Sequence, residues 1–93
     1  MVIDSEQFRR SLLTKGFVGD NTDHRTFRHL YSGRYSGVTT KLSHGARHDI
    51  TRGLLGCHKR QMKLDTTQQV VDFTKCQMSG SEYNEILIQK QLI

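Results

Sequence analysis

The chain has 93 residues, of which 34% are hydrophobic and none is tryptophan or proline, and its formal net charge is +5. This length allows one small domain with a modest core. The sequence has neither an apolar run long enough for a membrane span nor the basic, apolar start of a signal sequence. Its two cysteines lack a C-x-x-C spacing, which argues against a disulfide framework and favours buried thiols. We therefore expect a soluble, cytoplasmic protein.

The positive charge is concentrated in the middle of the chain. Residues 23–63 carry nine basic and two acidic side chains, a net charge of +7, together with all five histidines. Residues 1–22 are balanced, and residues 64–93 have a net charge of −2. Clustered positive charge attracts a phosphate backbone, and imidazoles titrate near neutral pH and can move protons. This combination predicts RNA as the partner, with a merely solvated basic surface as the alternative.

The first predicted element is a helix that begins after Asp4. Asp4 is suited to the N-cap position, Gln7 can complete a capping box, and Gly16 ends the helix. The apolar stripe of this helix consists of Phe8, Leu12 and Leu13. Residues 18–23 are rich in turn-forming types, so only a short strand is expected there.

A β-hairpin is predicted next. Residues 24–31 and 35–42 are β-rich runs on either side of the turn Ser32-Gly33-Arg34. We assign Phe27 to the core face of the first run, so alternation puts a second set on the open face: His24, Thr26 and Arg28. In the second run one face is formed by Val38, Thr40 and Leu42.

The remainder of the chain is predicted to be helical. Residues 43–48 form a connecting loop, and Asp49 is expected to cap a helix over residues 50–64. Two further helices are indicated by capping-box pairs, namely Asp65 with Gln68 and Ser79 with Glu82. We interpret His48 and His58 as surface or helix-face residues.

This order of elements resembles the HicA family of toxin ribonucleases over approximately residues 3–63. The resemblance rests on three segments: Lys15-Gly16-Phe17 after the first helix, Asp23–Arg28 at the start of an aromatic strand, and Val38–Lys41 after the glycine-bearing turn. It implies an α+β fold similar to a double-stranded-RNA-binding domain, α-β-β(-β)-α with an antiparallel sheet, in residues 1–64. Residues 65–93 are then expected to be a helical C-terminal extension packed on the same domain.

The resemblance also implies a function. Members of the family are endoribonucleases that cleave mRNA without a metal or another cofactor and are inhibited by a HicB-type antitoxin. Their working histidine carries over onto His24 of this chain. The chain departs from the family's sequence pattern in two places: Thr22-Asp23 replaces the family's Gly-Ser, and the run from Gly16 to His24 is shorter than usual.

Metal-independent cleavage of RNA needs a base for the 2′-hydroxyl, cations near the phosphate oxygens and an acid for the leaving oxygen. His24 is the candidate base, and the acid is open between His44 and His29. The candidate RNA-binding residues are Arg25, Arg28, Lys41, His44 and Arg47. Three aromatic residues can stack on bases, although packing is the commoner role in a hairpin: Phe27, Tyr31 and Tyr35.

Other functions stay open at this point. The same fold can be an RNA-binding module without turnover, or an interaction protein whose C-terminal helices dock a partner or cover the basic face as an autoinhibitor. A zinc site built from residues 44, 48, 57 and 58 is disfavoured, because their spacing matches no common zinc pattern. We expect neither a metal nor an organic cofactor.

Overall fold

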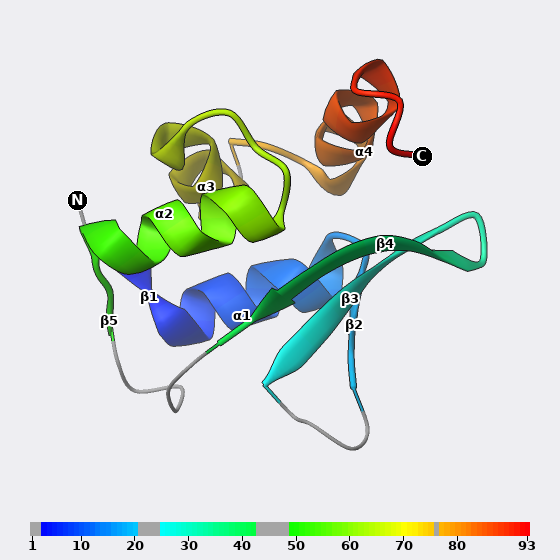
Figure 1. The fold of residues 1–93 in the computed structure, drawn as a ribbon. Helices are drawn as coiled ribbons and strands as arrows, with labels where there is room; N and C mark the ends of the chain where they lie inside the picture. Colours follow the sequence, from blue (N-terminus) through cyan, green and yellow to red (C-terminus); the bar gives the residue numbers. More distant parts are fainter. Residues whose placement is uncertain (1–2, 21–24, 43–48, 76) are drawn as a thin grey trace.

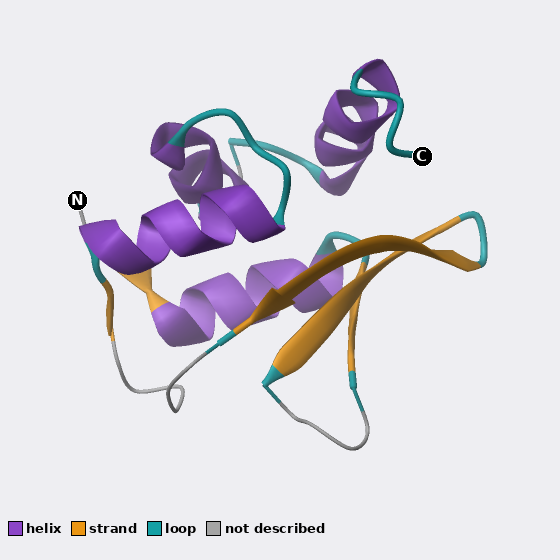
Figure 2. Ribbon diagram, viewed as in Figure 1, coloured by secondary structure: helices purple, strands orange, loops and turns teal. Residues whose placement is uncertain are grey.

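The computed structural model describes residues 3–20, 25–42, 49–75 and 77–93. The elements of this part are β1 Ile3–Asp4, α1 Ser5–Thr14, β2 Phe17–Gly19, β3 Thr26–Tyr31, β4 Arg34–Lys41, β5 Asp49–Ile50, α2 Arg52–Gln61, α3 Thr67–Thr74 and α4 Gly80–Gln89. They form an α+β fold with two antiparallel sheets, β2-β3-β4 and β1-β5 (Figure 1; Figure 2). None of the described helices has the length and apolar content needed to cross a lipid bilayer.

The three-stranded sheet contains the predicted hairpin. Its turn residues Ser32 and Gly33 have φ angles of 51° and 78°, and two left-handed residues in succession match the twist of antiparallel strands. The register of β3 with β4 shifts between Arg28 and Leu30. Arg28 pairs with Thr39 and Leu30 pairs with Tyr35, so a step of two residues along β3 corresponds to a step of four residues along β4. Because the extra length is even, side chains on both sides of the irregularity keep the same face.

Alternate side chains of this sheet face a core that all four described helices share. The buried set from the strands is Phe17, Phe27, His29, Val38 and Thr40. The helices contribute buried apolar residues to the same cluster, among them Phe8, Leu55, Phe73 and Tyr83. The core face predicted for Phe27 is therefore confirmed, and the face predicted to be shared by Val38, Thr40 and Leu42 is buried as well. In Figure 1 the described helices lie on this side, and none of them covers the opposite, open face of the sheet.

The C-terminal helices belong to this core. Phe73 of α3 and Tyr83 of α4 pack against Phe17 of β2. Their ring centroids lie 6.1 and 5.7 Å, respectively, from the ring centroid of Phe17. Lys15, at the end of α1, donates from Nζ to the carbonyl oxygens of Phe73 and Met78. Helices α3 and α4 thus pack on the helix side of the sheet and not over its open face. This arrangement contradicts the idea that these two helices cover the basic face.

Two predicted helix starts are confirmed. Asp4 Oδ2 accepts a hydrogen bond from the backbone N–H of Gln7 at 3.2 Å. Ser79 and Glu82 form a full capping box, in which the Ser79 hydroxyl oxygen accepts from Glu82 N at 3.1 Å and Glu82 Oε1 accepts from Ser79 N at 3.0 Å. These bonds satisfy backbone donors that have no partner inside the helix, which is why local sequence was sufficient to find both ends.

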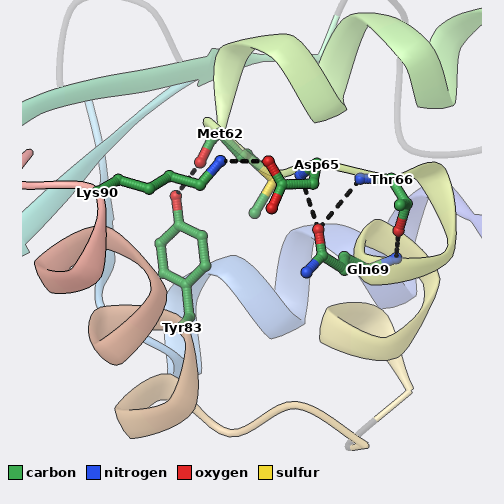
Figure 3. Close-up of polar contacts among 6 residues, drawn as sticks. All are labelled: Met62, Asp65, Thr66, Gln69, Tyr83 and Lys90. Atoms are coloured by element: carbon green, nitrogen blue, oxygen red, sulfur yellow. Dashed lines mark hydrogen bonds and ion pairs between the residues drawn. The ribbon is translucent and has the colours of Figure 1, made fainter.

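A third predicted capping box lies one residue later than expected. Asp65 and Gln68 were the expected pair, but Thr66 Oγ1 accepts from Gln69 N at 3.2 Å and Gln69 Oε1 accepts from Thr66 N at 3.1 Å (Figure 3). The carboxylate of Asp65 instead lies 2.6 Å from Nζ of Lys90, in the last turn of the chain. The Asp65 side chain is therefore paired with Lys90, and Thr66 occupies the N-cap position of α3.

The predicted helix over residues 50–64 begins later and ends earlier than expected. Asp49 is not its N-cap, because Asp49 and Ile50 form β5 and pair with β1. Thr51 occupies the N-cap position of α2 instead. The pairing sets Ile50 opposite Ile3, and both side chains are buried to 2% exposure. Burial of two isoleucines stabilises the strand pair by more than one helix cap would contribute.

Close packing at the start of α4 leads to a stability prediction. A Cβ added to Gly80 would lie 3.2 Å from backbone atoms of Lys15, whereas a Cβ on Gly53 would meet nothing within 4 Å. We expect Gly80→Ala to lower the free energy of unfolding by about 1–3 kcal/mol, because the backbone must shift. Gly53→Ala, the matched control, should leave stability unchanged or raise it by up to about 1 kcal/mol. Urea denaturation of both variants measures the difference, and equal effects would contradict the close approach.

Candidate nucleic-acid interface

The open face of the three-stranded sheet carries exposed polar and charged side chains. Arg28 of β3 lies in its middle, opposite Val18 of β2 on one side and Thr39 of β4 on the other. All three side chains are exposed, as the alternation along the strands predicts. The open face is therefore accessible to a ligand at its centre.

Arg28 is held in place by two contacts on this face. Its Nη2 lies 2.9 Å from Asp20 Oδ2, and its guanidinium carbon lies 6.0 Å from the centroid of the Tyr35 ring. The Arg28 side chain is 50% exposed and the Asp20 side chain 16%. Such a half-exposed ion pair contributes little to stability. Its consequence is positional, because it fixes a hydrogen-bond donor, an acceptor and an aromatic ring beside one another.

A cavity of about 320 Å³ opens on this face and is lined by Val18, Gly19, Asp20, Arg28 and Tyr35. Tyr35 is 60% exposed and Val18 is 40% exposed. Of the three aromatic residues considered for base stacking, Phe27 is buried in the core and Tyr31 is half-buried, so Tyr35 is the exposed one. This cavity was not predicted from the sequence, because Asp20 was interpreted only as a residue of a turn.

Two candidate RNA-binding cations lie at one end of the sheet. Lys41 pairs with Thr26 at the end of β4, and the backbone N–H of Leu42 donates to the carbonyl oxygen of Arg25 at 2.8 Å. Arg25 and Lys41 are both exposed. Arg28 follows two residues after Thr26 on the same face. The other predicted site residues lie outside the described part of the chain: His24, His44 and Arg47.

His29, one of the two candidate acids, is on the core side of the sheet. It has no exposed surface and lies between the rings of Phe17 and Tyr83, at centroid distances of 5.2 and 5.3 Å. Its Nε2 is 2.7 Å from Asn84 Oδ1 and its Nδ1 is 2.8 Å from Ser36 Oγ. An amide oxygen only accepts, so Nε2 carries the proton and Nδ1 accepts from the Ser36 hydroxyl.

This network keeps the His29 ring neutral. Burial lowers the pKa of His29, and the hydrogen bond to Asn84 opposes that shift only in part. Protonation of Nδ1 would also set two donors against each other, unless the Ser36 hydroxyl turned away. A neutral ring without exposed surface cannot protonate a leaving group on a bound RNA strand, so the hypothesis that His29 is the acid is wrong.

His58 is likewise buried, which corrects the expectation that it lies at the surface. It is 3% exposed, and its ring packs 4.7 Å from the ring of Phe8. Thr40 donates its hydroxyl proton to Gln61 Oε1 at 2.6 Å, so Nδ1 of His58 must donate to Thr40 Oγ1 at 2.8 Å. Burial lowers the pKa of His58 to about 4. The helical spacing of residues 55, 58 and 62 was the available signal, since Leu55 and Met62 are buried on the same face.

The described residues give no support for the zinc site considered at residues 44, 48, 57 and 58. Among the described residues, no three His, Cys, Asp or Glu side chains come together in a way that could hold a metal ion. His44 and His48 lie outside the described residues. Cys57 is half-buried beside Arg60, and His58 is engaged with Thr40.

The open face thus combines an exposed tyrosine with a paired arginine and carboxylate, and the exposed cations Arg25 and Lys41 lie at one end of the sheet. Known protein families, curated proteins and solved structures give no match to this chain.

Proposed function

We propose that the protein binds RNA across the open face of β2-β3-β4 and cleaves it through His24, as a toxin-type endoribonuclease similar to HicA. The observation that carries the proposal is the position of Arg25 and Lys41 at the end of the sheet where β3 begins. His24 directly precedes Arg25 in the chain. Exposed cations next to a histidine are what phosphodiester cleavage by acid–base chemistry requires.

The proposed reaction uses the RNA's own 2′-hydroxyl as nucleophile. His24 takes the 2′-hydroxyl proton, the 2′-oxygen forms a bond to phosphorus, and the 5′-oxygen leaves with a proton from an acid. Arg25 and Lys41 stabilise the charge that develops on the non-bridging phosphate oxygens. The products are a 2′,3′-cyclic phosphate and a free 5′-hydroxyl, and no metal or other cofactor takes part. His44 is the remaining candidate for the acid.

The fold and the charge distribution support two further parts of this proposal. Helix α1, the sheet β2-β3-β4 and helix α2 follow one another in the order of a double-stranded-RNA-binding domain. The uncovered face is suited to an inhibitory partner of HicB type, because an acidic antitoxin would be steered to the basic surface and would hide it. We propose that both proteins act in the cytoplasm, where mRNA is the substrate.

A second candidate function is RNA binding without cleavage. The observation in its favour is that the two described histidines, His29 and His58, are buried and held neutral. The ion pair of Arg28 with Asp20 also leaves the middle of the open face less positive than the sequence suggests. Under this alternative the same surface holds the RNA backbone and no proton is transferred.

Removal of His24 separates the two candidates. We expect the wild-type protein to cleave a mixed single-stranded RNA in EDTA and to leave 2′,3′-cyclic phosphate ends. His24→Ala should reduce the cleavage rate by about 100-fold or more, because the base is lost. Its affinity for RNA should change by no more than about twofold, because the phosphate contacts that dominate affinity remain. Gel analysis of end-labelled RNA and fluorescence anisotropy measure the two quantities.

His48→Ala serves as the control, because His48 has no part in the proposed site, and it should cleave like the wild type. If the wild-type protein binds RNA and does not cut it, the binding function replaces the catalytic one. If it neither binds nor cuts RNA, both candidates fail.

A further inference from the structure

We infer that the cavity beside Tyr35 is a binding site for one unpaired base of single-stranded RNA, with a preference for guanine. This inference rests on the proposed RNA-binding function and names the class of RNA that the open face accepts. It is built on the five residues that line the cavity of about 320 Å³, namely Val18, Gly19, Asp20, Arg28 and Tyr35.

The first argument is the exposed ring of Tyr35. A tyrosine 60% exposed on a strand contributes little to the core, whereas Phe27 on the neighbouring strand is buried to 2%. Tyr35 pairs with Leu30, and the even register shift brings its ring to the same face as Arg28. Aromatic rings and guanidinium planes on an open sheet are the surfaces on which unstacked bases are held. Tyr35 and Arg28 together form such a surface.

The second argument is the polar edge of the cavity. Asp20 and Arg28 are 2.9 Å apart, so a strong acceptor and a strong donor lie next to each other at one wall. Both groups have several bonding sites, because a carboxylate offers about four lone-pair sites and a guanidinium has five N–H donors. A ligand that fits both must present N–H donors directly beside an acceptor oxygen.

Guanine has that pattern on its pairing edge. Its N1–H and N2–H₂ groups donate side by side, and O6 accepts next to them. Adenine and cytosine each present one amino group on this edge, and uracil presents one N–H. The Asp20 carboxylate therefore suits the guanine donors, while Arg28 suits O6. In a duplex this edge is already paired to cytosine, so the base must come from a single strand.

The third argument is the geometry of the whole face. Thr26, which pairs with Lys41, and Leu30, which pairs with Tyr35, are four residues apart on β3. At the rise of an extended strand this separation is about 13 Å. One RNA strand can therefore place its backbone at the cationic end near Lys41 and reach the cavity with a base a short distance along the chain.

Binding of short RNA strands tests the site. The probes are fluorescein-labelled oligo-uridine strands of 2′-O-methyl RNA, which cannot be cleaved, with either uridine or one guanosine at the centre, and a duplex of the guanosine strand. We expect anisotropy titrations to show that the wild-type protein binds the guanosine strand roughly tenfold more tightly than the all-uridine strand or the duplex. Tyr35→Ala should weaken binding of the guanosine strand roughly tenfold, whereas Tyr35→Phe, which keeps the ring, should not.

Asp20→Asn completes the experiment, because it removes the carboxylate with a minimal change of shape. It should bind the two single strands with equal affinity, and circular dichroism checks that it is folded. The inference is overturned if the wild type binds duplex and single strands equally and Tyr35→Ala has no effect, while the proposed RNA-binding function then stands. A preference for single strands without any preference for guanosine overturns the role of Asp20. Absence of binding to any probe refutes the proposed function itself.

Discussion

Replacement of Tyr83 with alanine should lower the free energy of unfolding by about 3–5 kcal/mol, the range for removal of a large buried ring. Tyr83 has no exposed surface, and its ring lies 5.3 Å from the rings of both Phe73 and His29. Its hydroxyl donates to the carbonyl oxygen of Met62 at 2.7 Å (Figure 3). Burial raises the pKa of this phenol well above its usual value, so the group remains protonated and continues to donate.

Tyr83→Phe is the matched control for this prediction. It keeps the ring contacts and removes only the donor to Met62, so we expect a loss of about 1–3 kcal/mol. Urea denaturation followed by circular dichroism measures both variants against the wild type. Because small domains are stable by only about 5–15 kcal/mol in total, the alanine variant should lose a large part of its stability. A loss below about 1 kcal/mol would show that α4 is not an integral part of the core.

Acidification from pH 7 to pH 4.5 should reduce the free energy of unfolding by about 2–3 kcal/mol through His58 alone. In the folded protein its pKa is lowered from 6.5 to about 4, because the buried ring favours the neutral form. The unfolded chain therefore takes up this proton first, near pH 6.5. Stability is fully present above that pH and is lost as the pH falls towards 4, at about 1.4 kcal/mol for each unit of pKa difference. His29 acts in the same direction, because its pKa is also lowered.

His58→Gln tests the assignment. The glutamine amide can still donate to Thr40 Oγ1 but does not titrate, so the variant should lose clearly less stability than the wild type between pH 7 and pH 4.5. Urea midpoints at several pH values give the two curves. Parallel curves for the two proteins would show that His58 is not the group responsible.

Several local features of the fold could be predicted from the sequence alone. The caps at Asp4 and Ser79 depend on bonds between residues three apart, and the tight turn at Ser32 and Gly33 depends on its own backbone angles. Once Phe27 is assigned to the core, alternation along the strand puts Arg28 on the open face, and in the next strand it groups Val38 with Thr40 on one face. Each of these features is decided by neighbours within a few residues, so the local pattern carries the information.

Other features arose from contacts that no local pattern contains. Ile3 and Ile50 meet in a two-stranded sheet, and their burial replaced the helix start expected at Asp49. Helix α4 brings Asn84 to His29, which changed a candidate acid into a buried, neutral residue. In both places the burial of side chains from distant parts of the chain decided the outcome.

The candidate site divides in the same way. Composition and charge alone indicated a basic central segment, and alternation alone put Arg28 on the open face. Only the strand pairing brought the ring centroid of Tyr35 to 6.0 Å from the guanidinium carbon of Arg28. The irregular register, with two extra residues in β4, determines which side chains of the two strands are neighbours. Only the path of the chain after β2 placed Asp20 beside the same guanidinium. A sequence states which residues are available on a face, whereas the meeting of an acceptor, a donor and a ring depends on distances that exist only after the chain has folded.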